Sequence, residues 1–168
     1  MPGTAGETMP KLDQLSEVLR KTLLMFPCVE HDDTPWTPMR KPLSESKLAL
    51  VTSAGLHVRD DQPFIHDSKS GDQSYRVIPR STSTTEIVQS HVSIGFDHTG
   101  IYRDINVTFP VDRLQELADQ GVIGSLADNN YSFMGALRDV TRVVEETGPE
   151  VAQRMLDEGV EVVLLTPT

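Results

Sequence analysis

Four ionisable side chains follow the apolar run that predicts the first strand of the chain. The run Leu48–Val51 is long enough for one buried strand, and the small residues at 52–55 then let the backbone turn tightly. His57, Arg59, Asp60 and Asp61 come directly after that turn. Open α/β sheets bind ligands at the carboxyl ends of their strands, so this stretch predicts a site. The alternative is a solvated connection whose charges face water.

Apolar residues elsewhere recur in the patterns of alternating strands and helices. This alternation predicts an α/β fold with a mainly parallel open sheet, Rossmann-like and three-layered, with helices on both faces. Residues 41–168 would form this domain, and residues 1–40 would form a tail, an amphipathic helical arm and a Pro-rich strap. The expected strands are 48–51, 75–78, 87–94, 122–126 and 160–165, and the expected helices are 12–26, 110–121, 137–147 and 151–159.

Three local expectations depend on less regular stretches. Residues 101–107 are expected to form a short extended piece, and residues 128–135 a polar and aromatic connection. The nearly continuous apolar run 160–165 predicts a strand buried on both faces. If that strand lies at an edge of the sheet instead, its unpaired backbone favours self-association.

Composition excludes several classes of function. The net charge of −10 argues against nucleic acid, which requires a basic face. Apolar runs are far shorter than the ~20 residues of a membrane span, and the N-terminus lacks the apolar centre of a signal peptide, so we expect a cytoplasmic protein. The single cysteine, Cys28, excludes an internal disulfide framework. Neither a dinucleotide-binding glycine motif nor a phosphate-binding loop with its lysine is present.

Five blocks, in the same order, resemble a known family. They are KPLSESKLALVTSAGLHVRDDQPF, SYRVIP, RDINVTFPVDRLQELADQGVIGSLA, YSFMGA and EVVLLTPT, and together they cover about residues 41–168. The chain is similar here to selenoprotein B of glycine, sarcosine and betaine reductases, and to the related D-proline reductase subunit. In that family the last strand is followed at once by a redox-active selenocysteine or cysteine. This resemblance places the redox residue just after Thr168, where the sequence ends.

That ending has two explanations. Selenocysteine is encoded by a codon that otherwise reads as a stop, so the sequence would be C-terminally truncated at a misread codon. Otherwise the chain is a short relative that lacks the redox residue. Cys28 lies too far upstream to replace that residue by sequence position.

The resemblance implies reductive cleavage of a C–N bond in an amino-acid-like substrate. A selenolate or thiolate would attack the carbon that bears the nitrogen, and a small redox protein would complete the reduction. No cofactor is expected in this chain, and a carbonyl cofactor on a partner subunit would activate some of the substrates. The expected partners are therefore other subunits of a reductase complex, and an oligomer is expected.

The candidate site residues would then form the wall of that site. His57 and His91 each follow an apparent strand and are candidates to donate protons to a leaving amine. Aspartates would hold an ammonium group, arginines a carboxylate, and one tyrosine would line the pocket. These substrate-binding candidates are Arg59, Asp60, Asp61, Arg76, Asp97, Arg103, Asp104, Asn106 and Tyr131. For each, the competing interpretation is structural: a hydrogen-bonded histidine, a loop cap, an internal ion pair or a core aromatic.

Two other functions stay open. One is a non-catalytic small-molecule-binding or assembly subunit that keeps the fold without the redox residue. The other is a metal-assisted hydrolase or lyase that uses His57, Asp61, His91, Asp97 and His98. No tight spacing such as H-x-x-x-H supports a metal site, and none is predicted.

Overall fold

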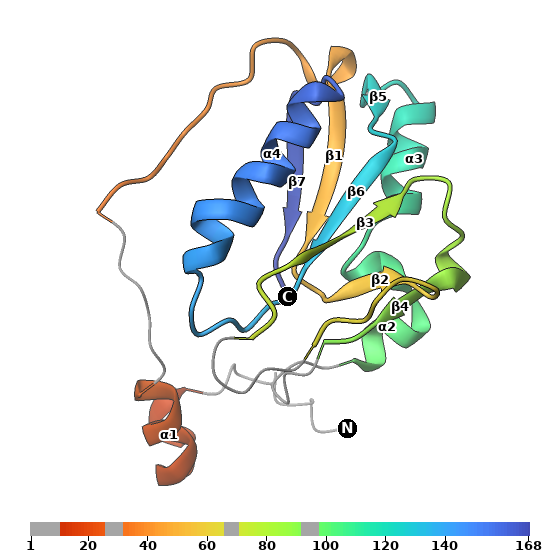
Figure 1. Cartoon of the computed structure of the whole chain (residues 1–168). Helices are drawn as coiled ribbons and strands as arrows, with labels where there is room; N and C mark the ends of the chain where they lie inside the picture. Colours follow the sequence, from red (N-terminus) through yellow and green to blue (C-terminus); the bar gives the residue numbers. More distant parts are fainter. Residues whose placement is uncertain (1–10, 26–31, 66–70, 92–97) are drawn as a thin grey trace, which may run out of the picture. The chain divides into compact units, whose positions relative to one another are not determined.

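The computed structural model describes residues 11–25, 32–65, 71–91 and 98–168 (Figure 1). The candidate residues Cys28 and Asp97 lie outside the described residues. The chain divides into two compact units, Met1–Trp36 and Thr37–Thr168. Each is described by itself below.

The first unit contains the predicted amphipathic helix in two pieces. A 3-10 turn at Leu12–Gln14 precedes helix α1 at Glu17–Leu24. Ser16 separates them because it is the N-cap of α1, and its hydroxyl accepts a hydrogen bond from the Leu19 amide at 3.3 Å. The single helix from residue 12 is therefore corrected to a shorter helix, none of whose residues is buried.

Strand β1 (Lys47–Thr52) is the centre of the sheet in the second unit. It pairs in parallel with β5 (Ser125–Leu126) and β6 (Asn129–Phe133) along one edge, and with β7 (Val162–Thr166) along the other. Strand β3 (Tyr75–Pro79) pairs with β6 in the antiparallel direction. The predicted α/β fold with a mainly parallel sheet is thus confirmed, while its Rossmann-like detail stays a prediction.

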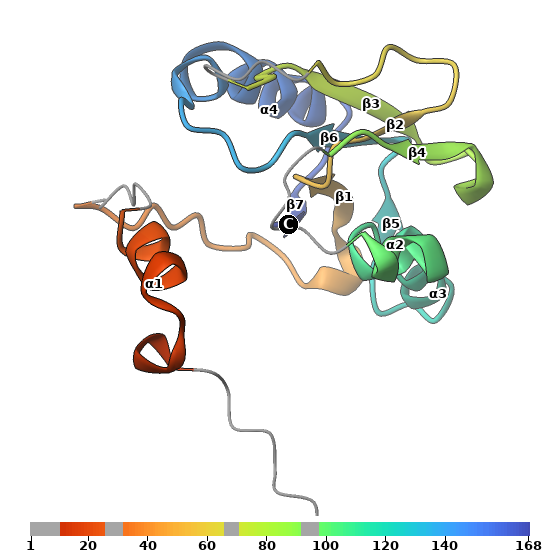
Figure 2. The same ribbon diagram turned by 90° about the horizontal axis from the view of Figure 1, so that it is seen from below.

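Helices cover both faces of this sheet, as Figure 2 shows. Leu48 and Leu50 of β1 pack with Leu114 of helix α3 (Val111–Asp119), whereas Ala49 packs with Met155 of helix α4 (Gly148–Asp157). Neighbouring strand residues point to opposite faces, so α3 and α4 lie on opposite sides. In the described ranges, no helix has the length and apolar character needed to cross a membrane.

A second, two-stranded sheet replaces part of the expected loop after β1. Strand β2 (Leu56–Val58) pairs in the antiparallel direction with β4 (Ile87–Gln89). Gly55 makes the sharp entry to β2 possible with a φ of +63°. His57 therefore lies within a strand and not in a loop.

Strand β6 corrects the expected connection at 128–135. The hydrophobic pattern does not reveal this strand, because its buried positions hold polar residues whose side chains bond to the backbone of other strands. The side-chain oxygen of Asn130 accepts from the Leu50 amide at 3.0 Å, and the Ser132 hydroxyl accepts from the Leu56 amide at 2.8 Å. Buried amide and hydroxyl groups thus perform the role that apolar side chains perform in β1.

Two helical segments also differ from expectation. Residues 101–107 form helix α2 (Thr99–Arg103) and a 3-10 turn at Ile105–Val107, not an extended piece. The expected break at Gly148–Pro149 does not occur, because a π-helical turn at Val143–Thr147 runs directly into α4. In that turn the Gly148 amide donates to the Val143 carbonyl, five residues back. Pro149 is the second residue of α4, immediately after this turn, so the helical hydrogen bonds lack one donor at that point.

Strand β7 is an edge strand among the described residues, since β1 is its one partner there. Its exposure alternates: Val162 and Leu164 pack against the main core, while Leu165 remains 67% exposed. The expected burial on both faces is therefore wrong. The apolar run reflects two different faces of β7: one packs on the core, and the other is apolar but exposed to solvent.

Candidate functional site

The carboxyl ends of β1 and β7 are joined by side-chain hydroxyls. Ser53 follows β1 directly, and its amide donates to the Thr166 carbonyl at 3.2 Å. The Ser53 hydroxyl accepts from the Thr168 amide at 2.8 Å and lies 3.4 Å from the Thr168 carbonyl oxygen. Thr168 is consequently held against the end of the central strand.

Two threonine hydroxyls next to this edge share one acceptor, and of these residues Thr52 is buried and Thr166 is partly buried. The hydroxyls of Thr52 and Thr166 both donate to the Thr108 carbonyl, at 3.1 and 2.8 Å. Thr52 also accepts from the Ala54 amide at 3.2 Å. Thr108 belongs to the connection between α2 and α3, so three distant parts of the chain meet at one carbonyl oxygen.

Gly135 allows His91 to approach this edge. A Cβ atom built on Gly135 would lie 2.6 Å from the Thr168 carbonyl oxygen, 2.9 Å from His91 Nε2 and 3.0 Å from the Ser53 carbonyl oxygen. Real Cβ atoms essentially never make contacts as short as the first two, so a glycine fits here without a shift of the backbone. The four residues therefore converge, and His91 is the one titratable side chain among them.

His91 is buried, and its ring lies near a second histidine. The exposed fraction of His91 is 6%, and its ring centroid is 6.4 Å from that of His98. Burial, with a smaller contribution from His98, lowers the pKa of His91 below its usual value of 6.5. His98 Nδ1 in turn lies 2.7 Å from the Gln89 side-chain oxygen. A neutral imidazole at physiological pH is able to accept a proton.

His57, the other candidate for proton transfer, has both ring nitrogens within hydrogen-bonding distance of other groups. Nδ1 lies 2.8 Å from the Val58 carbonyl oxygen, and Nε2 lies 2.7 Å from the Ser90 hydroxyl. The carbonyl is an acceptor only, so Nδ1 carries the proton and the Ser90 hydroxyl donates to Nε2. This arrangement fixes β2 against the segment that follows β4.

Arg76 is surrounded by acceptors of its own chain. Its guanidinium donates to the carbonyl oxygens of Gln62, Tyr75 and Pro63 at 2.6, 2.9 and 3.1 Å, and stacks on the Phe64 ring at 4.3 Å from the centroid. Asp72 completes the set at 3.7 Å. With 9% of the residue exposed, the guanidinium ties the segment after β2 to strand β3.

The charged residues that follow β2 are exposed. Arg59 donates to the Thr85 carbonyl at 3.1 Å, and Asp61 accepts from the Gln62 amide at 2.7 Å. Asp60 lies beside them with its side chain in solvent. This group is open to a ligand, but His91 belongs to the opposite end of the β2–β4 pair.

The remaining candidates have structural contacts or open positions. Asp104 caps the 3-10 turn at 105–107, and its bonds from the Asn106 side chain and amide lower the pKa of its carboxyl. Asn106 also donates to Asp112 at 2.9 Å and so fixes the start of α3. Arg103 is exposed at the end of α2. Tyr131 is buried in β6 against the Tyr75 ring, and burial raises the pKa of its phenol.

Sequence reasoning missed Ser53 and Gly135 as parts of the site. Ser53 was grouped with small turn residues, and Gly135 with an irregular connection. Ser53 follows β1 directly and Gly135 comes two residues after β6, and this place after a strand is the signal that could have identified them. The structure thus brings His91 together with these residues, while His57, Arg76, Asp104 and Asn106 take part in local hydrogen bonds.

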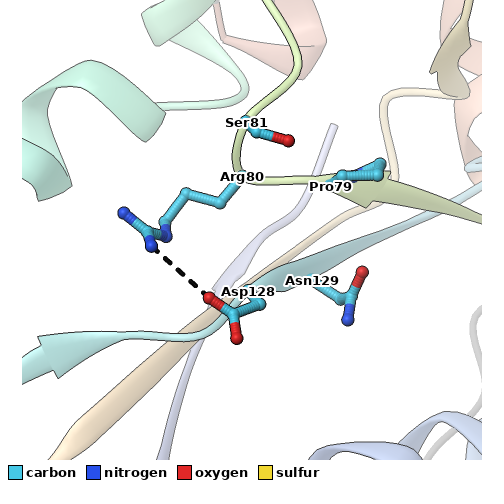
Figure 3. Close-up of a pocket in the computed structure, with 5 residues that line it drawn as sticks. All are labelled: Pro79, Arg80, Ser81, Asp128 and Asn129. Atoms are coloured by element: carbon cyan, nitrogen blue, oxygen red, sulfur yellow. Dashed lines mark hydrogen bonds and ion pairs between the residues drawn. The ribbon is translucent and has the colours of Figure 1, made fainter.

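A pocket of about 390 Å³ lies at the other end of the parallel strands. Figure 3 shows its lining residues, with an ion pair of 3.4 Å between Arg80 and Asp128. Arg80 also donates to Gln115, and the Asp128 amide donates to the Glu158 carboxylate. The lining is Pro79, Arg80, Ser81, Asp128 and Asn129. Across the described ranges, no group of three or more His, Cys, Asp or Glu side chains is arranged to hold a metal ion.

Comparison with known proteins gives a consistent set of relatives. The chain is 44% identical to the D-proline reductase subunit gamma of Acetoanaerobium sticklandii over 131 aligned residues. The aligned region covers 78% of this chain and 52% of that relative. It is 32% identical over 146 residues to a glycine reductase complex component B subunit gamma of Carboxydothermus hydrogenoformans, covering 85% of this chain and 33% of the relative.

A sarcosine reductase complex component B subunit beta of Peptoclostridium acidaminophilum is 28% identical over 143 residues, with the same coverage of 85% and 33%. The chain therefore spans about half the length of the first relative and a third of the other two. No solved structure matches it. The family model of the glycine/sarcosine/betaine reductase selenoprotein B matches residues 12–168, further toward the N-terminus than the five motifs reach. The resemblance is thus confirmed: the chain belongs to the glycine/sarcosine/betaine reductase selenoprotein B family.

Proposed function

We propose that this chain forms the site wall of a reductase subunit that cleaves a C–N bond of a glycine-, sarcosine-, betaine- or proline-type substrate. Its nucleophile, a selenolate or thiolate, would lie just after Thr168. The observation that carries this proposal is the convergence of Thr168, Ser53, Gly135 and His91 at the carboxyl edge of the sheet. Open α/β sheets place their chemistry at this edge.

The selenolate or thiolate supplies the electron pair that forms a bond to the carbon bearing the nitrogen. The C–N bond breaks, its electron pair leaves with the amine, and the amine needs one proton. His91 would manage that proton: because burial keeps it neutral near pH 7, it would accept the proton that the selenol or thiol loses on ionising and return that proton to the amine. A dithiol redox protein would then supply two electrons and release the reduced product.

Exposed charges near β2 and α2 are the candidates to bind the substrate. Arg103 is exposed at the end of α2 and would bind its carboxylate. Arg59, Asp60 and Asp61 are exposed too, but they are poorer candidates because they lie at the opposite end of the β2–β4 pair from His91. Arg76 is a poor candidate for this role since its guanidinium is buried against internal carbonyls.

Partners are part of the proposal. The relatives are named as subunits or components of D-proline, glycine and sarcosine reductases, two of them within complexes, so other reductase subunits would bind this protein too. A carbonyl cofactor, where a substrate needs one, would be carried by such a partner. We place the assembly in the cytoplasm, in amino-acid metabolism.

The decisive experiment is to sequence the coding DNA through and beyond the Thr168 codon. A UGA codon followed by an open frame that continues the homology supports a selenocysteine at this position. A UAA or UAG codon, or a UGA codon without a coding frame beyond it, contradicts the redox mechanism. The function would then be that of a small-molecule-binding or assembly subunit, which the internal hydrogen bonds of His57 and Arg76 favour.

A further inference from the structure

The β1–β7 ladder changes its hydrogen-bonding pattern at its last step. The two strands pair in parallel from Leu48 and Val162 to Thr52 and Thr166, and the Ser53 amide continues the ladder by donating to the Thr166 carbonyl. In a regular parallel ladder the Thr168 amide would next donate to the Ser53 carbonyl. It donates instead to the Ser53 hydroxyl, at 2.8 Å.

Because the Thr168 amide donates to the Ser53 hydroxyl, the Ser53 carbonyl does not accept that hydrogen bond. Its oxygen lies 3.0 Å from the Cβ position of Gly135, the same position that is 2.9 Å from His91 Nε2. The Ser53 hydroxyl therefore binds the backbone at Thr168, while the Ser53 carbonyl oxygen lies near Gly135 on the side where His91 approaches.

A hydroxyl is suited to this role because it both accepts and donates. It accepts from the Thr168 amide and is within 3.4 Å of the Thr168 carbonyl oxygen, so one side chain contacts both polar groups of one residue. Two contacts restrict the position of Thr168 and its orientation, which fixes the direction in which the backbone leaves β7.

We propose that Ser53 is a positioning residue: its hydroxyl sets the path of the backbone after β7 so that the side chain following Thr168 lies against His91. Gly135 permits this path because it has no side chain of its own to place between them. The inference rests on the proposed function, since it concerns the nucleophile expected after Thr168.

The test uses the chain with one cysteine added after Thr168. The rate of its alkylation by iodoacetamide is measured against pH, which gives the thiol pKa. Cys28 is replaced by serine in all variants so that one thiol reacts. We expect a thiol pKa of about 7.5 or lower, against about 8.5 for an ordinary cysteine, because a thiolate beside protonated His91 forms an ion pair that stabilises both charges and offsets the burial of the imidazole. Ser53→Ala should return the pKa to the ordinary value, and Ser53→Thr should restore the low value.

A second measurement needs no added residue. In the unextended chain, Ser53→Ala should raise the hydrogen-exchange rate of the Thr168 amide about tenfold, as expected for the loss of one hydrogen bond. Ser83→Ala is the matched control, because Ser83 accepts from the Thr85 amide at a 3-10 turn elsewhere in the chain. The control should leave both the exchange rate and the thiol pKa unchanged.

The possible failures are distinguishable. A thiol pKa of about 8.5 in the parent, unchanged by His91→Gln, overturns the proposed function. A low pKa that depends on His91 but not on Ser53 keeps the proposed function and overturns the role of Ser53. An unchanged exchange rate of the Thr168 amide in Ser53→Ala also overturns that role.

Discussion

The two ends of the parallel strands differ in charge and in exposure. At the carboxyl edge, Ser53, Gly135, His91 and Thr168 meet with a buried imidazole and no formally charged side chain among them. At the amino edge, the pocket is lined by Arg80 and Asp128, whose side chains are 42% and 76% exposed. The amino edge has a pocket of about 390 Å³, and the carboxyl edge has close contacts between segments that are far apart in the sequence.

This difference teaches that a surface pocket is weaker evidence for a functional site than the meeting of residues from distant parts of the chain. The Arg80–Asp128 pair is exposed, and exposed pairs contribute little to stability and little selective chemistry. The carboxyl edge joins segments that are far apart in sequence and requires a glycine to do so. Constraints of that kind are what a site needs to hold reacting groups in fixed positions.

The largest difference in stability between the two edges is expected for two arginine substitutions, one at Arg76 within β3 and one at Arg80 directly after it. Arg76→Met should lower the free energy of unfolding by about 3 kcal/mol, because it leaves buried carbonyls and Asp72 without their donor. Arg80→Met, at the amino edge, should lower it by less than about 0.5 kcal/mol. Urea unfolding followed by circular dichroism measures both. Equal losses would contradict the distinction drawn here.

Glycines provide the second test. Gly135→Ala should cost about 2 kcal/mol in urea unfolding, because the methyl group collides with two backbone carbonyls and an imidazole. Gly100→Ala is the control: its Cβ would meet Val107 at 3.6 Å, an ordinary contact, inside helix α2. We expect this control to be neutral or slightly stabilising. A tolerated Gly135→Ala would show that the carboxyl edge is loosely packed.

The third prediction concerns pH. His91 has a lowered pKa in the folded chain, so below its usual value of 6.5 the unfolded chain binds the proton more readily. The stability contributed by neutral His91 is present above pH 6.5 and is lost as pH falls through the folded pKa. His91→Gln should flatten the loss of unfolding free energy between pH 7 and 5, measured by denaturation at each pH. A slope unchanged by the substitution would place the protonation elsewhere.

The smallest effect is expected at the edge of β7. Its residues 162–166 carry no charge, and Leu165 is exposed, so the chain lacks the usual charged protection of an edge strand. We expect weak, concentration-dependent self-association in sedimentation velocity, which Leu165→Lys should reduce. A strictly monomeric parent at high concentration would contradict this prediction.

The sequence predicted the fold best for elements whose apolar residues are the ones that pack in the core. Strands β1 and β3 and helix α3 lie where their apolar residues indicated. Strand β6 was missed because Asn130 and Ser132 are buried through side-chain hydrogen bonds, which no pattern of hydrophobicity reveals. The alternating exposure of β7 was missed because its open face is apolar as well.

The site was predictable in part. The edge of the sheet and His91 were identified from the position of ionisable residues after strands. Whether an arginine is free or surrounded by carbonyls, as Arg76 is, depends on segments that approach from elsewhere in the chain. The same holds for Ser53 and Gly135, whose importance appears only when Thr168 is beside them.

The threonine contacts at the Thr108 carbonyl have a consequence for synthesis of the protein. Thr52, Thr108 and Thr166 are separated by more than fifty residues at each step, so these bonds close very large loops of chain. Contacts of such long range form slowly. During translation, the edge of β1 that pairs with β7 stays unpaired until β7 has left the ribosome. The nascent chain is therefore exposed to misassembly until β7 appears, and a chaperone that shields β1 would act in that interval.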